Sequence, residues 1–332
     1  MPPSPLSASR RTVASLFRQN ARLRASLDRE FERLDALPAA YPSFHLAMRS
    51  YQRSLAAAAA ANDRALAALY GAPSPRLHDA LLEHLSPPAA YDGLGAVWRQ
   101  LANEWTGEGS VSLGALRRRL CGLAAAHSPA SVLVPGCGMA RLAWELARAL
   151  PHARVLALDA SEAQVGAARA MLRCAAPAAV RFHPFLDEPR NALHARGRAA
   201  ALDAPDVAPA AEGGGLRLER ADFFEWARGA PPQVECVVTC FFLDCLQDPV
   251  AAVEAVRDAL APGGLWLFAG PLAYHHWPQL SPPVEHLLTL AAEVGLPPVG
   301  APELIHAPYV GAPGILRHDA DYTAAVWACR KA

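Results

Sequence analysis

Two glycines and one carboxylate follow successive apolar runs of this sequence in an arrangement that suits nucleotide binding. Pro135-Gly136-Cys137-Gly138 comes directly after the apolar run 132–134, and Asp159 ends the next run. Glycines let backbone N–H groups approach a ligand closely, and an acid at the tip of a second strand can accept both hydroxyls of a ribose. Because position 141 is Arg, the turn lacks the full G-x-G-x-x-G pattern of dinucleotide sites. The pattern therefore favours S-adenosylmethionine over NAD, and the alternative is an ordinary turn of a parallel sheet.

An acid and an aromatic residue form a second candidate contact for a nucleotide. Asp222-Phe223 follows the predicted strand 216–221, and the carboxyl ends of strands are where open α/β sheets bind ligands. Such a pair can hydrogen-bond the amino group of adenine and pack against its ring. The alternative is that Asp222 caps a helix that begins at Phe223, because Asp is a preferred N-cap residue.

Asp244 is the carboxylate best placed to act on a second molecule. It follows the predicted strand 234–240 and two phenylalanines, so we expect it at the same edge of the sheet as the glycine turn. The alternative is a solvated loop acid or a helix cap. The predicted strand 264–269 leads to His275-His276 at this edge, but adjacent residues of an extended chain point in opposite directions. We therefore expect no metal site.

The elements that position these residues alternate between strands and helices from residue 131 onward, which is typical of a parallel sheet with crossover helices. Strands are predicted at 132–135, 154–158, 180–184, 216–221, 234–240, 264–269 and 322–328. Helices are predicted at 140–150, 161–174 and 249–261.

The remainder of the chain divides into a helical region and one insertion. Residues 1–130 carry apolar residues at helical spacing and predict an all-helical region packed on the α/β core, which spans 131–332. Residues 186–215 interrupt the alternation with Pro, Gly and charged residues, so we expect an insertion or lid there.

Composition narrows the classes of partner. Among 332 residues, 31 are basic and 31 are acidic, so no excess positive charge favours nucleic acid. The apolar runs are too short to span a bilayer, and the seven cysteines contain no C-x-x-C pair. We expect a small-molecule substrate, no membrane or nucleic-acid partner, and a cytoplasmic location. The sequence leaves open a homodimer, a nuclear pool and, because the first 27 residues are rich in Ser and Arg and lack acids, an organellar transit peptide.

Several motifs taken together resemble one known family. The motifs are Pro135 to Glu145, Thr239 to Asp244, Pro262 to Trp266, and Gly270-Pro271-Leu272-Ala273-Tyr274-His275. In this combination the chain resembles the carnosine N-methyltransferase family from about residue 97 to 331. The resemblance implies an α/β fold, with a seven-stranded Rossmann-like methyltransferase sheet and an N-terminal helical part. It also implies transfer of a methyl group from S-adenosylmethionine to the imidazole Nδ1 of carnosine.

The resemblance also implies roles for individual residues. The family's substrate contacts match Asp244, His275 and Tyr322. Its cofactor contacts match Gln100, Gly136, Gly138, Asp159, Asp222 and Phe223.

This chain departs from the family at positions that concern the cofactor. Asp159 replaces a family Glu, Ala140 a usual Gly, and Asn103 a cofactor-contacting Arg, so Arg99 is an alternative contact for the donor carboxylate. The competing hypotheses are a methyltransferase of another small imidazole compound or of a protein or peptide histidine, and a protein that binds S-adenosylmethionine without catalysis.

Overall fold

The computed structural model describes residues 9–34, 41–72, 92–188, 192–212, 215–274, 280–316 and 318–332. The chain divides into two compact units. The first unit comprises Met1–Gly109, Ser161–Ala210 and Val310–Ala320. The second unit comprises Ser110–Ala160, Ala211–Tyr309 and Asp321–Ala332.

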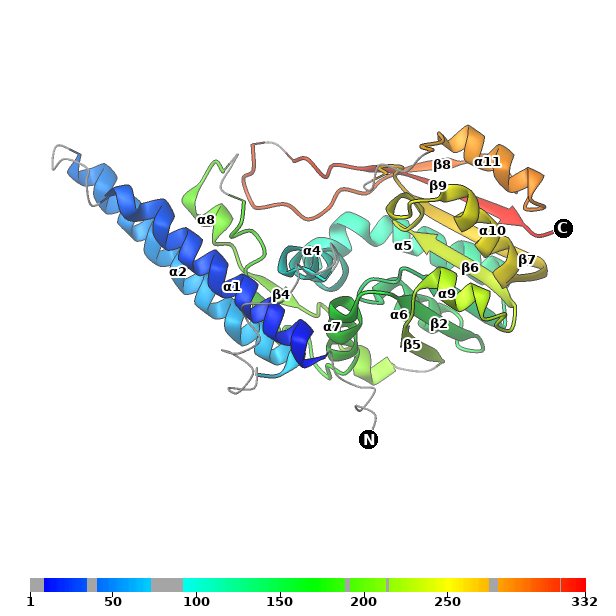
Figure 1. Cartoon of the computed structure of the whole chain (residues 1–332), viewed down its shortest axis with the longest axis horizontal. Coiled ribbons are helices and arrows are strands. Elements are labelled where there is room, and N and C mark those ends of the chain that lie inside the picture. Colours follow the sequence, from blue (N-terminus) through cyan, green and yellow to red (C-terminus); the bar gives the residue numbers. More distant parts are fainter. Residues whose placement is uncertain are drawn as a thin grey trace. The chain divides into compact units, whose positions relative to one another are not determined.

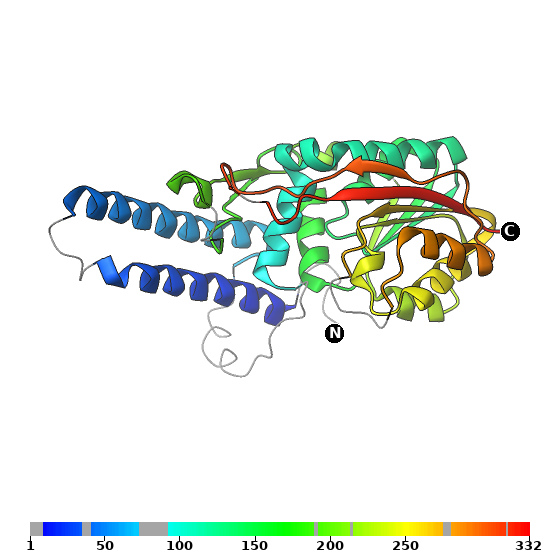
Figure 2. The same ribbon diagram turned by 90° about the horizontal axis from the view of Figure 1, so that it is seen from above.

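Long helices dominate the N-terminal part of the first unit. They are α1 (Arg10–Phe31), the short 3-10 helix η1 (Glu32–Leu34), α2 (Pro42–Tyr70) and α4 (Leu94–Trp105). Figures 1 and 2 show α1 and α2 running side by side, where Leu27 and Phe31 of α1 pack with Leu55 and Ala58 of α2. The expectation of an all-helical start is confirmed for the described residues, none of which before Ser131 lies in a strand. The packing of this region on the α/β core stays a prediction.

The first unit also contains short elements from the middle of the chain. They are α7 (Glu162–Leu172), β3 (Val180–Phe182), α8 (Ala195–Arg198), β4 (Leu202–Ala204) and the 3-10 helix η2 (Pro209–Glu212). Strand β3 was correctly predicted as a strand, but it pairs antiparallel with β4 in a separate two-stranded sheet. The predicted insertion 186–215 therefore supplies strand β4, and its partner β3 lies in the chain just before the insertion.

A seven-stranded sheet forms the second unit. Its strands are β1 (Ser131–Pro135), β2 (Arg154–Asp159), β5 (Leu216–Arg220), β6 (Val234–Cys240), β7 (Leu260–Gly270), β8 (Glu303–His306) and β9 (Thr323–Arg330). Their order is β5-β2-β1-β6-β7-β9-β8. The first five strands in this order are parallel, and β9 runs antiparallel to both neighbours. This topology is the predicted Rossmann-like methyltransferase sheet.

Helices cover both faces of this sheet. They are α5 (Gly107–His127), α6 (Arg141–Ala149), α9 (Phe223–Arg228), the 3-10 helix η3 (Leu243–Cys245), α10 (Pro249–Ala259) and α11 (Val284–Glu293). Figure 2 shows α5 on one face and α10 and α11 on the other. Helix α11 and strand β8 are findings that the sequence reasoning missed, because many prolines in that region argued for irregular structure. No helix among the described residues has the length and hydropathy needed to cross a bilayer.

Aromatic side chains of β7 and β9 form the centre of the core on one face of the sheet. Phe268 and Trp327 lie in register on neighbouring strands, and their rings stack with centroids 3.6 Å apart. Trp266 contacts both rings edge-on. All three side chains are buried in the cluster that also includes residues of α10 and α11. The cluster therefore joins the antiparallel edge of the sheet to its parallel part.

We predict that Trp327→Ala lowers the free energy of unfolding by about 3–5 kcal/mol, the usual cost of truncating a buried large aromatic residue. The measurement is urea denaturation followed by circular dichroism. Leu304→Ala on the adjacent strand β8 is the control, because that side chain is 74% exposed. A loss for Trp327→Ala no larger than the loss for Leu304→Ala would contradict this assignment of the core.

Candidate functional site

The glycine turn connects β1 to α6 and is tied to β2. Gly136 and Gly138 have φ values of +59° and +56°, in the left-handed region that favours glycine. The backbone N–H of Cys137 donates to Leu158 O at 2.9 Å, and that of Gly138 donates to Asp159 Oδ2 at 2.8 Å. The structure therefore brings together three of the predicted cofactor residues at the carboxyl ends of β1 and β2.

The segment after β6 lies directly against this turn. A Cβ atom at Gly136 would stand 2.1 Å from Cδ2 of Phe242. No real side chain atom fits at that distance, so the Phe242 ring occupies the space that any residue other than glycine would need. This close approach places the glycine turn beside the chain that carries Asp244.

Asp244 is a buried carboxylate within the 3-10 helix η3. Its side chain is 2% exposed, and Oδ2 accepts the backbone N–H of Ala273 at 3.0 Å. Two alternatives from the sequence are wrong, because Asp244 is not solvated and the cap of α10 is Asp248. Burying a carboxylate costs free energy unless polar groups compensate it. Buried ionisable side chains such as this one are typical of functional sites.

Three aromatic rings form a cluster near Asp244. Phe241, Tyr309 and Tyr322 contact one another pairwise, with ring centroids 5.3 to 5.9 Å apart. Phe241 follows β6, Tyr309 lies in the connection after β8, and Tyr322 immediately precedes β9. The structure thus brings the predicted Tyr322 to the region of Asp244.

Tyr309 is a candidate site residue that the sequence reasoning missed. Burial, followed by the nearby thiols of Cys245 and Cys240, raises the pKa of Tyr309 well above its usual value, and Tyr322 and Asp244 raise it further. Burial and Asp244 likewise raise the pKa of Tyr274 to about 12. Both hydroxyls therefore keep their protons at neutral pH and can act as hydrogen-bond donors.

Three residues other than glycine adopt left-handed backbone conformations at this edge of the sheet. Ala140, Phe241 and Tyr274 have φ values of +63°, +51° and +46°. They follow β1, β6 and β7, which are adjacent strands. Such conformations cost roughly 1–3 kcal/mol each and concentrate at functional sites. Their position supports this edge as the site independently of any motif.

The predicted adenine contacts have local structural roles. Asp222 is exposed, and its Oδ1 accepts the backbone N–H of Glu225 at 2.9 Å, so it caps α9 as the alternative proposed. The side chain of Phe223 is 4% exposed and packs among Phe224, Trp226 and Phe242. A contact between either residue and adenine stays a prediction.

Other predicted residues do not belong to the described part of the second unit. Gln100 is half-buried on α4 in the first unit, where Asn103 is buried and its Oδ1 accepts the N–H of Val310 at 2.7 Å. Arg99 is exposed on the same helix. His275 lies outside the described residues. Within the part of the chain that the structure describes, no group of three or more His, Cys, Asp or Glu residues could hold a metal ion.

Comparisons with known proteins give a consistent result. A family model described as carnosine N-methyltransferase matches residues 90–332. The chain is 28% identical to "Carnosine N-methyltransferase unmet" of Drosophila melanogaster, over 60% of this chain and 45% of that protein. It is 26% identical to the carnosine N-methyltransferase of Rattus norvegicus, over 55% of this chain and 48% of that protein. The chain thus spans about half the length of these curated relatives.

Solved structures are more distant. The N-methyltransferase NodS from Bradyrhizobium japonicum, in complex with S-adenosyl-l-homocysteine, is 18% identical with a TM-score of 0.41. That match covers 71% of this chain and 96% of NodS. The strand order of the sheet itself defines the fold class.

We predict that Gly136→Ala destabilises the protein more than Gly263→Ala does. Both glycines have positive φ, +59° and +74°, but nothing lies within 4 Å of a Cβ atom at Gly263. The pair therefore separates the clash with Phe242 from the backbone cost, which is about 1–2 kcal/mol for both. The measurement is the midpoint of thermal unfolding. Equal shifts for the two variants would show that the Phe242 ring yields without cost.

Proposed function

Because the chain belongs to the carnosine N-methyltransferase family, we propose that it transfers a methyl group from S-adenosylmethionine to the imidazole Nδ1 of a histidine-containing dipeptide of the carnosine type. The observation that carries the proposal is the close approach of Gly136 and Phe242. It sets a nucleotide-type glycine turn beside a segment that ends in the buried carboxylate of Asp244. A donor site and an acceptor site would thereby meet at one edge of the sheet.

The residues at the ends of β1 and β2 fit S-adenosylmethionine. Gly136 and Gly138 have left-handed backbone conformations that glycine adopts readily, as in the glycine turns of nucleotide sites. Asp159, held by the Gly138 N–H at 2.8 Å, would accept hydroxyl groups of the ribose. Asp222 and Phe223 would contact adenine. When bound, the sulfonium of this cofactor supplies an electrophilic methyl group.

Asp244 would select the reactive form of the acceptor. A neutral imidazole carries one N–H and one lone pair, so methylation at Nδ1 requires the proton on Nε2. Asp244, oriented by the Ala273 N–H, would accept that Nε2–H and thereby fix the tautomer. Its negative charge would also stabilise the positive charge that develops on the ring during transfer. No separate strong base is needed, because the attacking nitrogen has no proton to lose.

The aromatic cluster would surround the acceptor ring. Phe241, Tyr309 and Tyr322 come from three separate segments of the second unit, and aromatic faces attract cations through their quadrupoles. The ring becomes cationic during methyl transfer, so the attraction is stronger in the transition state than in the ground state. His275 and Tyr322 would orient the acceptor by hydrogen bonds, and proximity supplies the rest of the rate.

The acceptor can be identified by a panel of methyl-transfer assays. The panel contains carnosine, free histidine and histidine-containing peptides, with radiolabelled S-adenosylmethionine as donor. Methylation of carnosine at Nδ1 supports the proposal. Preference for free histidine or for peptides would identify instead another small imidazole compound or a protein histidine as the acceptor. Binding of the cofactor with no transfer to any of them would indicate a binding protein.

We predict that Asp159→Ala weakens the binding of S-adenosylhomocysteine by tenfold or more, because hydrogen bonds to a charged group contribute about 1.5–3 kcal/mol each. Asp159→Asn keeps an acceptor for Gly138 N–H and should lose less affinity. The measurement is isothermal titration calorimetry on the full chain. Unchanged affinity in both variants would remove Asp159 from the cofactor site.

We predict that Asp244→Asn nearly abolishes methyl transfer to carnosine at saturating cofactor, since the amide cannot neutralise the forming imidazolium. Loss of one such group costs on the order of 3 kcal/mol, roughly a hundredfold in rate. Asp248→Asn is the matched control, because this exposed residue caps α10 and Asn caps a helix as well as Asp does. Activity of Asp244→Asn equal to that of the control would leave the imidazole mechanism without support.

A further inference from the structure

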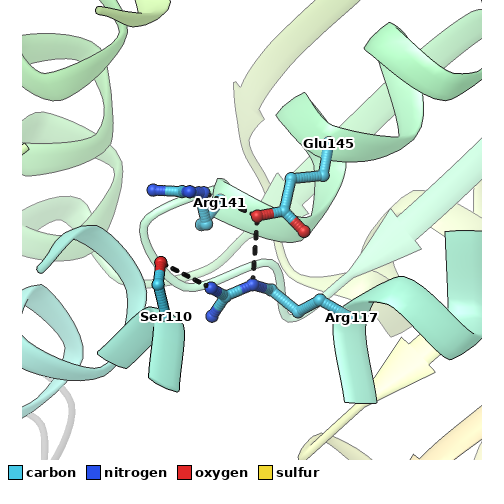
Figure 3. Close-up of polar contacts among 4 residues, drawn as sticks. All are labelled: Ser110, Arg117, Arg141 and Glu145. Atoms are coloured by element: carbon cyan, nitrogen blue, oxygen red, sulfur yellow. Dashed lines mark hydrogen bonds and ion pairs between the residues drawn. The ribbon is translucent and has the colours of Figure 1, made fainter. Parts of the chain in front are cut away.

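A buried ion network includes two residues of α6, the helix that follows the glycine turn. Glu145 Oε1 accepts a hydrogen bond from Nε of Arg141 at 2.8 Å and from Nε of Arg117 at 3.1 Å. Both arginine side chains are only 6% exposed. Figure 3 shows the carboxylate between the two guanidinium groups. One carboxylate oxygen therefore links helix α5, which carries Arg117, to helix α6.

The network is anchored at both ends. Arg117 also donates from Nη2 to Ser110 Oγ at 3.2 Å, about two turns earlier on α5 (Figure 3). Arg141 lies over the ring of Trp144, with its guanidinium carbon 5.2 Å from the ring centroid. The apolar face of α5, including Leu113, Leu116 and Leu120, is buried. The Arg117 guanidinium thus extends from a packed helix and holds Glu145 of α6 in a fixed position.

The start of helix α6 has a strained backbone and no side-chain cap. Arg141 is the first residue of α6, and Ala140 before it has a left-handed φ of +63°. Ala140 makes no side-chain capping hydrogen bond. A left-handed conformation is unfavourable for any residue with a Cβ, so surrounding structure must hold Ala140 in it. The same turn presents the Gly138 N–H to Asp159.

We propose that Arg117 and Glu145 are positioning residues for the cofactor turn. By fixing the first turn of α6, the network keeps Ala140 left-handed and keeps the backbone of Gly138 in its binding conformation. The inference rests on the proposed function only in taking S-adenosylmethionine as the ligand of the turn. The restraint is needed because position 140 is an alanine. A glycine there would adopt the left-handed conformation without an external restraint.

The test compares the affinity of the full chain for S-adenosylhomocysteine among four proteins by calorimetry. Arg117→Met keeps the aliphatic stem and removes the link between helices. We expect it to bind about tenfold more weakly, which corresponds to roughly 1.4 kcal/mol. The double variant Arg117→Met with Ala140→Gly should recover most of the lost affinity. Arg119→Met is the matched control, because Arg119 lies on the same helix in an exposed ion pair with Glu303, and it should bind as the wild type does.

The rescue separates positioning from a merely structural role. Loss of a purely structural ion pair lowers the unfolding temperature, and glycine at position 140 would not restore affinity, since glycine at a helix terminus adds no cross-helix contact. Unchanged affinity in Arg117→Met, or failure of Ala140→Gly to restore it, would refute the inference. If Arg117→Met does not fold, Arg117→Lys decides in the same way, because a lysine cannot contact Glu145 and Ser110 in the planar arrangement of a guanidinium.

The same titrations distinguish this inference from the proposed function. A wild-type protein that does not bind S-adenosylhomocysteine contradicts the proposed cofactor. A wild-type protein that binds it, together with an Arg117→Met variant of equal affinity, contradicts only the positioning role.

Discussion

The close contact between the backbone of Gly136 and the ring of Phe242 is the constraint on which the site depends. Strands β1 and β6 are parallel neighbours, so their carboxyl ends emerge at the same edge of the sheet. The chain after β6 can approach the turn after β1 only because Gly136 has no side chain. Phe241, Leu243 and Asp244 follow in that chain, so their positions depend on the same contact.

Buried charge is the second feature that organises the second unit. Asp244 and the group formed by Glu145, Arg117 and Arg141 are held in the interior by directed hydrogen bonds. Burying a charge is unfavourable unless its hydrogen-bonding partners are well placed. Each group of buried charges therefore favours the one local conformation in which its hydrogen bonds are formed. Asp244 would use that rigidity on the acceptor side, whereas the arginine network would use it on the cofactor side.

Backbone strain marks the same edge of the sheet. Ala140, Phe241 and Tyr274 are left-handed after β1, β6 and β7, and each lies where the chain leaves a strand to form the site. The core packing of the sheet, with Phe268 stacked on Trp327, provides the rigid base that such conformations require. The stability of the packed sheet therefore compensates for the strain at the residues that follow its strands.

The sequence by itself determined the elements whose residues are close along the chain. Apolar runs ended by glycine or acid predicted β1, β2 and β6, the glycine turn, and Asp159 and Asp244 at strand ends, because strand and turn preferences act over a few residues. The family motifs depend on the same local patterns.

Only the tertiary structure decided which distant residues meet. It paired β3 with β4 outside the main sheet, brought Tyr309 to the region of Asp244, and joined Arg117 to Glu145 across two helices. Local patterns carry no signal for these contacts, because their partners are set by the packing of whole elements. Such packing is a property of the folded chain and not of any short stretch of it.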